Sequence, residues 1–261
     1  MWFSSQEKPS EIDLARLARM SSRELHTLLA GDPAEAARWV EAAARQGLPA
    51  AQTRLGRMLL DGTGMPADAM RAVAWFKTAA RNLDADAMNM LGRCYEFGWG
   101  VTPDLLEATA WYRKSAERGD AWGQYNFAHR LLDGAGIAQD RTQALHWYLQ
   151  AAAQGHDRAM NLAARCYEEG WGTARDLGQA VEWYRRSAEA GYFRAQYNYA
   201  TALAQQGRIE EAAGWFHAAA EGGTPEMRRT VAEVLSYSRH PALLDVAAQA
   251  QSLMQDQAQT A

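Results

Sequence analysis

Tryptophan recurs at a fixed interval through most of this chain. Five tryptophans are spaced 36 residues apart and a sixth follows after 32 residues: Trp39, Trp75, Trp111, Trp147, Trp183 and Trp215. Each lies in a similar frame of small and aromatic residues, such as "ATAWYRKSA" and "AVEWYRRSA". A period of this length indicates one supersecondary unit copied along the chain, and this constrains the fold more than any other feature.

Each copy predicts two helices. In the third copy, small and aromatic residues occupy one face of an α-helix, at i, i+3, i+4, i+7 and i+8: Ala108, Trp111, Tyr112, Ser115 and Ala116. Because the tryptophans lie on this face, we expect Trp75, Trp111, Trp147 and Trp183 to belong to the core. A second helical stretch precedes each of these helices and carries small residues that suit close packing, as at Gly92.

A Gly-x-Gly joint connects the two helices of a copy, at Gly62/Gly64, Gly98/Gly100, Gly134/Gly136 and Gly170/Gly172. The first glycine of each joint falls where a helix commonly ends in a left-handed residue. An aspartate then stands where it can cap the second helix, at Asp68, Asp104, Asp140 and Asp176. A further glycine ends the second helix of most copies. Leu83 occupies that place in one copy, so we expect its helix to end in another way.

One hairpin cannot bury both of its faces, so stacked copies predict an α-solenoid. Complete repeats are expected at 50–85, 86–121, 122–157 and 158–193, with a half repeat at 31–49 and a shortened repeat at 194–225. Residues 1–30 are expected to form an N-terminal helical cap, with a capping box at Ser21 and Glu24. Residues 226–261 are expected to form a C-terminal helical cap, with helices at 226–238 and 242–257.

The complete pattern is A-x5-G-x2-[YL]-x2-G-x-G-x3-D-x3-A-x2-W[YF]-x2-[AS]A-x2-G. It resembles the Sel-1-like repeat, a relative of the tetratricopeptide repeat with a longer turn, over 31–225. The resemblance implies an all-α fold, a right-handed superhelix of stacked helical hairpins with a concave face. It also implies a scaffold or adaptor, of bacterial type, that binds a protein or peptide partner. The copy at 194–225 departs from the family pattern because it lacks the Gly-x-Gly turn.

Composition argues against several other classes of protein. The net charge is -4 and the basic residues are dispersed, so we expect no nucleic-acid partner. No window of 18 apolar residues exists, so we expect no membrane span, and the first residues lack the apolar region of a secretory signal. We therefore expect a cytoplasmic protein.

Cys94 and Cys166 occur in the near-identical stretches "CYEFGWG" and "CYEEGWG". They lie two repeats apart, which is about 20 Å for packed helices, whereas a disulfide requires Cα atoms within about 7 Å. We expect both to fill small helix positions.

No motif for chemistry is evident. The six histidines lack metal-ligand spacing, and no phosphate-binding or nucleophile motif follows a strand. We therefore expect no metal, no cofactor, no catalytic residue and no enzyme activity.

Two alternative functions stay open. One is a toxin-immunity or secretion-linked partner-binding protein. The other is a β-lactam-binding or hydrolysing enzyme, as in members of the resembled family that have a disulfide in each repeat, which this chain lacks.

The first helix of each hairpin lines the concave face in a tetratricopeptide-like stack. Ten residues of these helices form the candidate partner-binding set: Asn89, Arg93, Glu96, Trp122, Tyr125, His129, Asn161, Arg165, Glu168 and Tyr197. Asparagine amides suit a partner's backbone, arginines suit carboxylates, and the aromatic residues offer rigid apolar contact. Alternatively, Arg93 and Arg165 pair with the glutamates three residues further on, on a solvated face. Trp99 and Trp171, in the turns, are secondary candidates.

Overall fold

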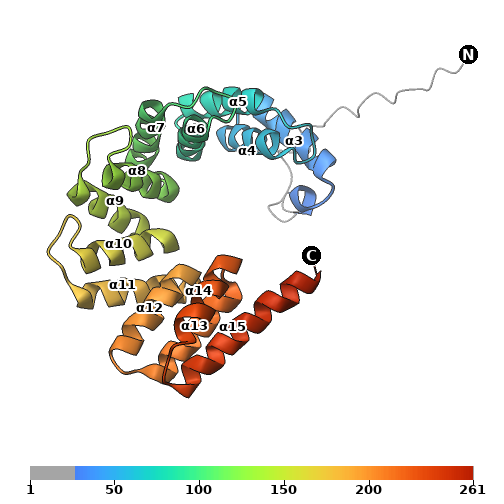
Figure 1. Cartoon of the computed structure of the whole chain (residues 1–261). Coiled ribbons are helices and arrows are strands. Elements are labelled where there is room, and N and C mark those ends of the chain that lie inside the picture. Colours follow the sequence, from blue (N-terminus) through green and yellow to red (C-terminus); the bar gives the residue numbers. More distant parts are fainter. Residues whose placement is uncertain (1–26, 261) are drawn as a thin grey trace, which may run out of the picture. The chain divides into compact units, whose positions relative to one another are not determined.

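The computed structural model describes residues 27–260, and every regular element in this range is an α-helix (Figure 1). The capping box at Ser21 and Glu24 lies outside the described residues, and the assignment of the two ends as caps stays a prediction. The helices are α3 (Pro33–Arg45), α4 (Pro49–Asp61), α5 (Ala69–Arg81), α6 (Ala85–Phe97), α7 (Leu105–Glu117), α8 (Ala121–Asp133), α9 (Arg141–Ala153), α10 (Asp157–Glu169), α11 (Leu177–Glu189), α12 (Phe193–Gln205), α13 (Ile209–Gly222), α14 (Pro225–Leu235) and α15 (Pro241–Thr260).

The helices stack in pairs, as the repeat predicts. The chain divides into two compact units, of which the first ends at Gly123 and the second begins at Gln124. In the first unit, α4 pairs with α5 and α6 with α7, while α3 packs on α4 and α5 on α6. In the second unit, α10 pairs with α11 and α12 with α13, and α14 and α15 both pack on α13. Each unit is therefore a stack of helical hairpins, which confirms an all-α solenoid.

The joints between helices form as expected from their glycines and aspartates. Gly98 ends α6 with φ 73°, and its N–H donates to the Cys94 carbonyl. Asp104 precedes α7, and its side chain accepts hydrogen bonds from two backbone N–H groups of the first turn. The second glycine has a different role: a Cβ at Gly100 would lie 2.3 Å from the Ala69 carbonyl oxygen. This glycine therefore lets one hairpin approach the next.

In each of the later repeats, the residue that directly follows the tryptophan in the sequence belongs to the core. The aromatic residue that follows each of the last five repeat tryptophans is 0–4% exposed: Phe76, Tyr112, Tyr148, Tyr184 and Phe216. The four tryptophans expected to belong to the core are half-buried and lie at its edge: Trp75, Trp111, Trp147 and Trp183. Trp75, Trp111 and Trp183 pack against buried core residues. Successive helix residues differ by about 100° in direction, so the buried face turns away from each tryptophan. The ring of Tyr112 packs on Gly92, where a Cβ would lie 2.5 Å from it.

Helix α5 ends in the same way as the helices that end at glycine, so the expectation of a different ending was wrong. Leu83 adopts the left-handed conformation, with φ 65°. Its N–H donates to the Ala80 carbonyl at 3.0 Å, and the Asp84 N–H donates to the Ala79 carbonyl at 3.2 Å. These bonds outweigh the backbone strain of a side chain in this conformation.

Candidate partner-binding site

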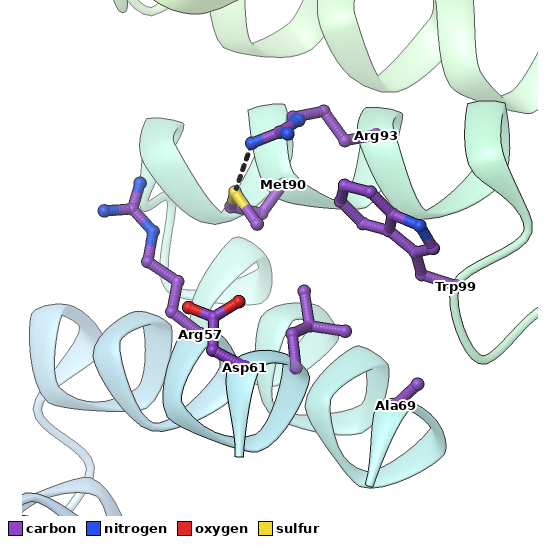
Figure 2. A pocket seen from close by; sticks show the side chains of 7 residues that line it. Arg57, Asp61, Ala69, Met90, Arg93 and Trp99 are labelled. Carbon is purple, nitrogen blue, oxygen red and sulfur yellow. Dashed lines mark hydrogen bonds between the residues drawn. The ribbon is translucent and has the colours of Figure 1, made fainter. Parts of the chain in front are cut away.

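An arginine lies on a tryptophan ring in the first unit. The guanidinium carbon of Arg93, on α6, lies 5.0 Å from the centre of the Trp99 ring, which stands in the turn after that helix (Figure 2). Nη1 of Arg93 also lies 3.9 Å from the sulfur of Met90. A guanidinium stacked on a ring keeps N–H donors at its edge, where a carboxylate can accept from them. We call Arg93 and Trp99 the first Arg–Trp cluster.

A cavity of about 520 Å³ opens beside this cluster. Its lining comes from two successive hairpins: Arg57, Leu60, Asp61, Ala69, Met90, Arg93 and Trp99 (Figure 2). Arg57 forms an ion pair with Asp86, at the start of the next first helix. Because Asp86 pairs with Arg57 and Asp61 is also in the lining, the positive and negative charges at this cavity are equal in number.

The second unit contains a related cluster 72 residues further on. The guanidinium carbon of Arg165 lies 5.0 Å from the centre of the Trp171 ring, and that of Arg141 lies 5.9 Å from the same ring. Arg141 stands where Ala69 stands in the first unit, so this second Arg–Trp cluster has an additional positive charge. His129 takes the place of Arg57, and its Nε2 lies 3.5 Å from an Asp133 oxygen.

The two glutamates of the candidate set bind tyrosines of the following helix. The Tyr112 hydroxyl donates to Glu96, and the Tyr184 hydroxyl donates to Glu168 at 2.7 Å. Burial, followed by the hydrogen bond to this carboxylate, raises the pKa of Tyr184 well above its ordinary value. In the described part of the chain, the arginines three residues before these glutamates lie over indole rings. The alternative interpretation, pairing within the helix, stays a prediction.

The asparagines of the candidate set lie beneath the surface. Asn89 is 4% exposed and Asn161 is 7% exposed. Nδ2 of Asn198, on α12, donates to the Asn161 side-chain oxygen at 3.0 Å. The Asn161 amide therefore contacts the neighbouring first helix, and both asparagines are too deeply buried to offer much surface to a partner.

The aromatic members of the set differ in exposure. Trp122, in the first unit, is 46% exposed. In the second unit, Tyr125 stacks on the His156 ring with centroids 4.9 Å apart, and Nδ1 of His129 lies 3.2 Å from the Tyr148 hydroxyl. Tyr197 packs edge-on against a core phenylalanine, Phe216. These residues form a half-buried aromatic surface on the first helices of the second unit.

The sequence-based set missed Arg57, Asp61 and Arg141. Arg57 occupies the same position as Arg93 one repeat earlier, 36 residues before it. The repeat period alone could therefore have identified it. Arg141 begins a second helix, and its approach to Trp171 depends on the joint at Gly172, where a Cβ would meet the Arg141 carbonyl oxygen at 2.2 Å. No pattern within a single helix predicts that approach.

Neither a metal-binding cluster nor a membrane-spanning helix occurs in the described range. No group of three or more histidine, cysteine or carboxylate side chains suited to a metal ion occurs in residues 27–260. No helix in that range is long and apolar enough to cross a membrane.

Cys94 and Cys166 are free and buried, and burial raises the pKa of both thiols to about 12. This confirms them as small packing residues.

Stacked helical hairpins joined through close-packed glycines define a repeat protein of the α-solenoid class. The Sel1 repeat family profile matches six segments, residues 14–48, 49–82, 85–120, 123–156, 157–192 and 194–224. The chain therefore belongs to the Sel1 repeat family. A search of curated proteins found no match.

Three solved bacterial structures share the fold. A Sel1 repeat protein from Oxalobacter formigenes is 28% identical with a TM-score of 0.79, covering 88% of this chain and 97% of that one. A protective antigen of uropathogenic Escherichia coli strains is 26% identical with a TM-score of 0.71, covering 88% of this chain and 54% of that one. An immunity protein from Pseudomonas aeruginosa is 17% identical with a TM-score of 0.52, covering 80% of this chain and 81% of that one, and this likeness concerns the fold alone.

Proposed function

We propose that this chain is a non-enzymatic scaffold that binds a protein or peptide partner on the first helices of its hairpins. The observation that carries the proposal is the pair of Arg–Trp clusters, each with a guanidinium stacked on an indole ring in a turn. Stacking desolvates one side of the guanidinium and orients it, which suits recognition of a carboxylate. Arginine and tryptophan are also the residues most often found to dominate binding energy at interfaces.

The ten candidate residues divide into two groups in this proposal. Six contact the partner: Arg93, Trp122, Tyr125, His129, Arg165 and Tyr197. The other four lie behind the contact residues: Glu96, Asn161 and Glu168 position their neighbours through side-chain hydrogen bonds, and Asn89 is buried in α6. The partner therefore presents carboxylates to the two arginines and apolar side chains to the aromatic residues.

The test replaces both arginines of the clusters, as Arg93→Glu with Arg165→Glu. Wild-type and variant chains are used to capture partners from the native host, and the captured partner is then purified and titrated. We expect the double variant to bind at least about tenfold more weakly, because each glutamate repels the carboxylate that the arginine attracts. Equal affinity in a folded double variant would remove the cluster assignment.

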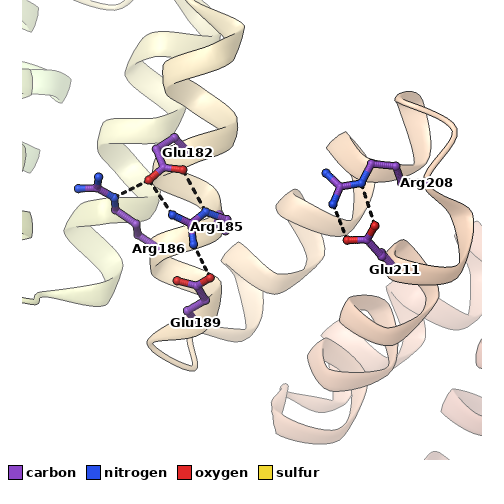
Figure 3. A network of polar contacts seen from close by, with 6 residues as sticks. All are labelled: Glu182, Arg185, Arg186, Glu189, Arg208 and Glu211. Atoms are coloured by element: carbon purple, nitrogen blue, oxygen red, sulfur yellow. Dashed lines mark hydrogen bonds and ion pairs between the residues drawn. The ribbon is translucent and has the colours of Figure 1, made fainter.

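A matched control has the same charge change on second helices. Arg113 and Arg185 are also 72 residues apart, and both form ion pairs along their own helix. Arg185 lies between Glu182 and Glu189 (Figure 3). Its Nη2 lies 2.8 Å from Oε1 of Glu182, and its Nη1 lies 2.5 Å from Oε1 of Glu189. Exposed pairs of this kind contribute little to stability, so the double variant Arg113→Glu with Arg185→Glu should fold. We expect it to bind the partner as the wild type does.

A toxin-immunity role is a special case of this proposal. The captured partner supports it if the partner is a toxic enzyme that loses activity when the chain is added. A partner without toxic activity contradicts the immunity role and leaves a general adaptor.

The second alternative, β-lactam binding or hydrolysis, is tested with a labelled β-lactam. If the folded protein retains no label, this alternative is excluded.

A cytoplasmic location is also part of the proposal. Cell fractionation tests the location, and recovery of the protein from the periplasm or the medium would contradict it.

A further inference from the structure

A second cavity, of about 630 Å³, lies in the first unit, away from the Arg–Trp cluster. It opens where α5 passes into α6 and extends along the last turns of α7. None of the residues in its lining belongs to the candidate set or to the first cavity. Its apolar lining includes Leu83, Met88 and Trp111, and its basic lining consists of Arg81, Lys114 and Arg118.

Leu83 is strained and exposed at this cavity. Four glycines hold the equivalent place in other repeats, with φ between 85° and 92°: Gly47, Gly119, Gly155 and Gly191. Leu83 takes φ 65°, which is unfavourable for a residue with a Cβ, and its side chain is 58% exposed. Glycine would end this helix with less strain, and core packing does not require an exposed leucine. Strain retained at a surface position indicates a function for the side chain.

Met88 provides an apolar floor for the same cavity. Glutamine holds the equivalent place in the two adjacent repeats, at Gln52 and Gln124, whereas the repeat two units further on has Met160. Gln52 donates to the Ala44 carbonyl at 3.1 Å, and Gln196, in the shortened repeat, donates to the Ala188 carbonyl at 3.4 Å. Met88 is 4% exposed and lacks such a donor. This repeat therefore differs from its neighbours at two positions of one cavity, and both differences make the cavity more apolar.

The charged lining is positive, although the chain as a whole is not. Lys114 lies 4.0 Å from the centre of the Trp111 ring, and Arg81 and Arg118 lie at the ends of the two second helices beside it. The one carboxylate of the lining, Glu117, pairs with Arg113 at 2.8 Å. Three cations around an apolar pocket are complementary to a ligand with both carboxylates and an apolar side chain.

We propose that this cavity is a second docking site, which binds a short acidic peptide segment. An aliphatic or aromatic side chain of the segment lies between Leu83 and Trp111, over Met88, and flanking carboxylates pair with Arg81, Lys114 and Arg118. The site shares no residue with the Arg–Trp clusters, so it does not depend on the function proposed for them.

The test uses short synthetic peptides with a fluorescent label, each with a central leucine or phenylalanine. One series has aspartate and glutamate at the flanks, and the other has lysine. Binding is followed by fluorescence anisotropy on the full chain. We expect the acidic series to bind the wild type and the lysine series not to bind. Leu83→Gly should weaken binding at least about tenfold, and so should Lys114→Glu with Arg118→Glu.

Thermal unfolding separates loss of the site from loss of the fold. Leu83→Gly removes backbone strain, so its midpoint of unfolding should equal or exceed that of the wild type while its binding is lost. The same substitutions are repeated in a chain with Arg93→Glu and Arg165→Glu, because the Arg–Trp clusters are themselves proposed to attract carboxylates. Leu83→Gly should weaken peptide binding at least about tenfold in this background too. Equal affinity of the wild type and Leu83→Gly, or no binding of any acidic peptide to the wild type, overturns the proposal.

Discussion

The hydroxyl group of Tyr184 donates a 2.7 Å hydrogen bond to the carboxylate of Glu168, which joins the second helix of one hairpin to the first. The Tyr112 hydroxyl makes the same contact with Glu96 in the first unit. In both hairpins the arginine three residues before the glutamate lies over a tryptophan ring. The buried tyrosine of the second helix is therefore bonded to the same turn of the first helix that carries the Arg–Trp cluster.

Replacing Tyr184 with phenylalanine tests this bond. The variant removes the donor and leaves a half-buried carboxylate without it, so we expect a loss of about 1–2 kcal/mol in the free energy of unfolding. Urea unfolding of the full chain measures the change. Glu168→Gln keeps an acceptor for the hydroxyl and should cost less. Equal stability of Tyr184→Phe and the wild type would show that the bond contributes nothing.

The second glycine of each joint should tolerate no side chain. In Gly100→Ala, the new Cβ would meet the Ala69 carbonyl oxygen at 2.3 Å, and the backbone would keep φ 69°. We expect a loss of about 2 kcal/mol or more, from strain and from the hairpins moving apart. Gly119→Ala is the matched control: its φ is 85°, but nothing lies within 4 Å of the new Cβ. It should cost only about 1 kcal/mol by the same urea measurement.

His156 should make stability depend on pH. Nδ1 of its ring accepts from the Ala159 N–H at 3.2 Å and so caps α10. Burial lowers its pKa below the ordinary value of 6.5, and the neighbouring Asp157 opposes this while Arg158 adds to it. As the pH falls below about 6.5, the unfolded chain binds a proton that the folded chain does not. Acidification should therefore destabilise the second unit until the folded pKa is reached.

The variant His156→Asn isolates this effect. Asparagine can cap a helix but does not titrate in this range, so the stability of the variant should change less between neutral pH and pH 5. Thermal unfolding at several pH values compares the two chains. A wild type whose stability responds to pH no more than that of His156→Asn would contradict the prediction.

The two thiols should resist modification in the folded protein. Burial raises the pKa of Cys94 and Cys166 to about 12, and neither side chain is accessible. We expect a thiol reagent at neutral pH to label them only as the chain unfolds, because the thiolate is the reactive form. Cys166→Ala then reports on the first unit and Cys94→Ala on the second. Rapid labelling of the native chain would contradict the burial of the thiols.

Much of the fold follows from the sequence because its signals are local. A Gly-x-Gly joint, an aspartate placed to cap the next helix, and small residues at helical spacing each act within a few residues. Gly98 and Asp104 therefore predict where one helix ends and the next begins. The 36-residue period predicts that the hairpins stack, since a single hairpin cannot bury both faces.

Only the tertiary structure decided which side chains meet between helices. The periodicity of one helix could not separate Trp111 from the buried Tyr112 beside it, because both lie near the packed face. It also could not decide whether Arg93 pairs with Glu96 or lies on Trp99. Trp99 comes from the turn after the helix, and Tyr112, which binds Glu96, comes from the following helix. Leu83 shows the same limit, because the hydrogen bonds of a helix end outweighed its local preference against φ 65°. Local preferences set where helices begin and end, and contacts between distant residues set which side chains remain exposed to a partner.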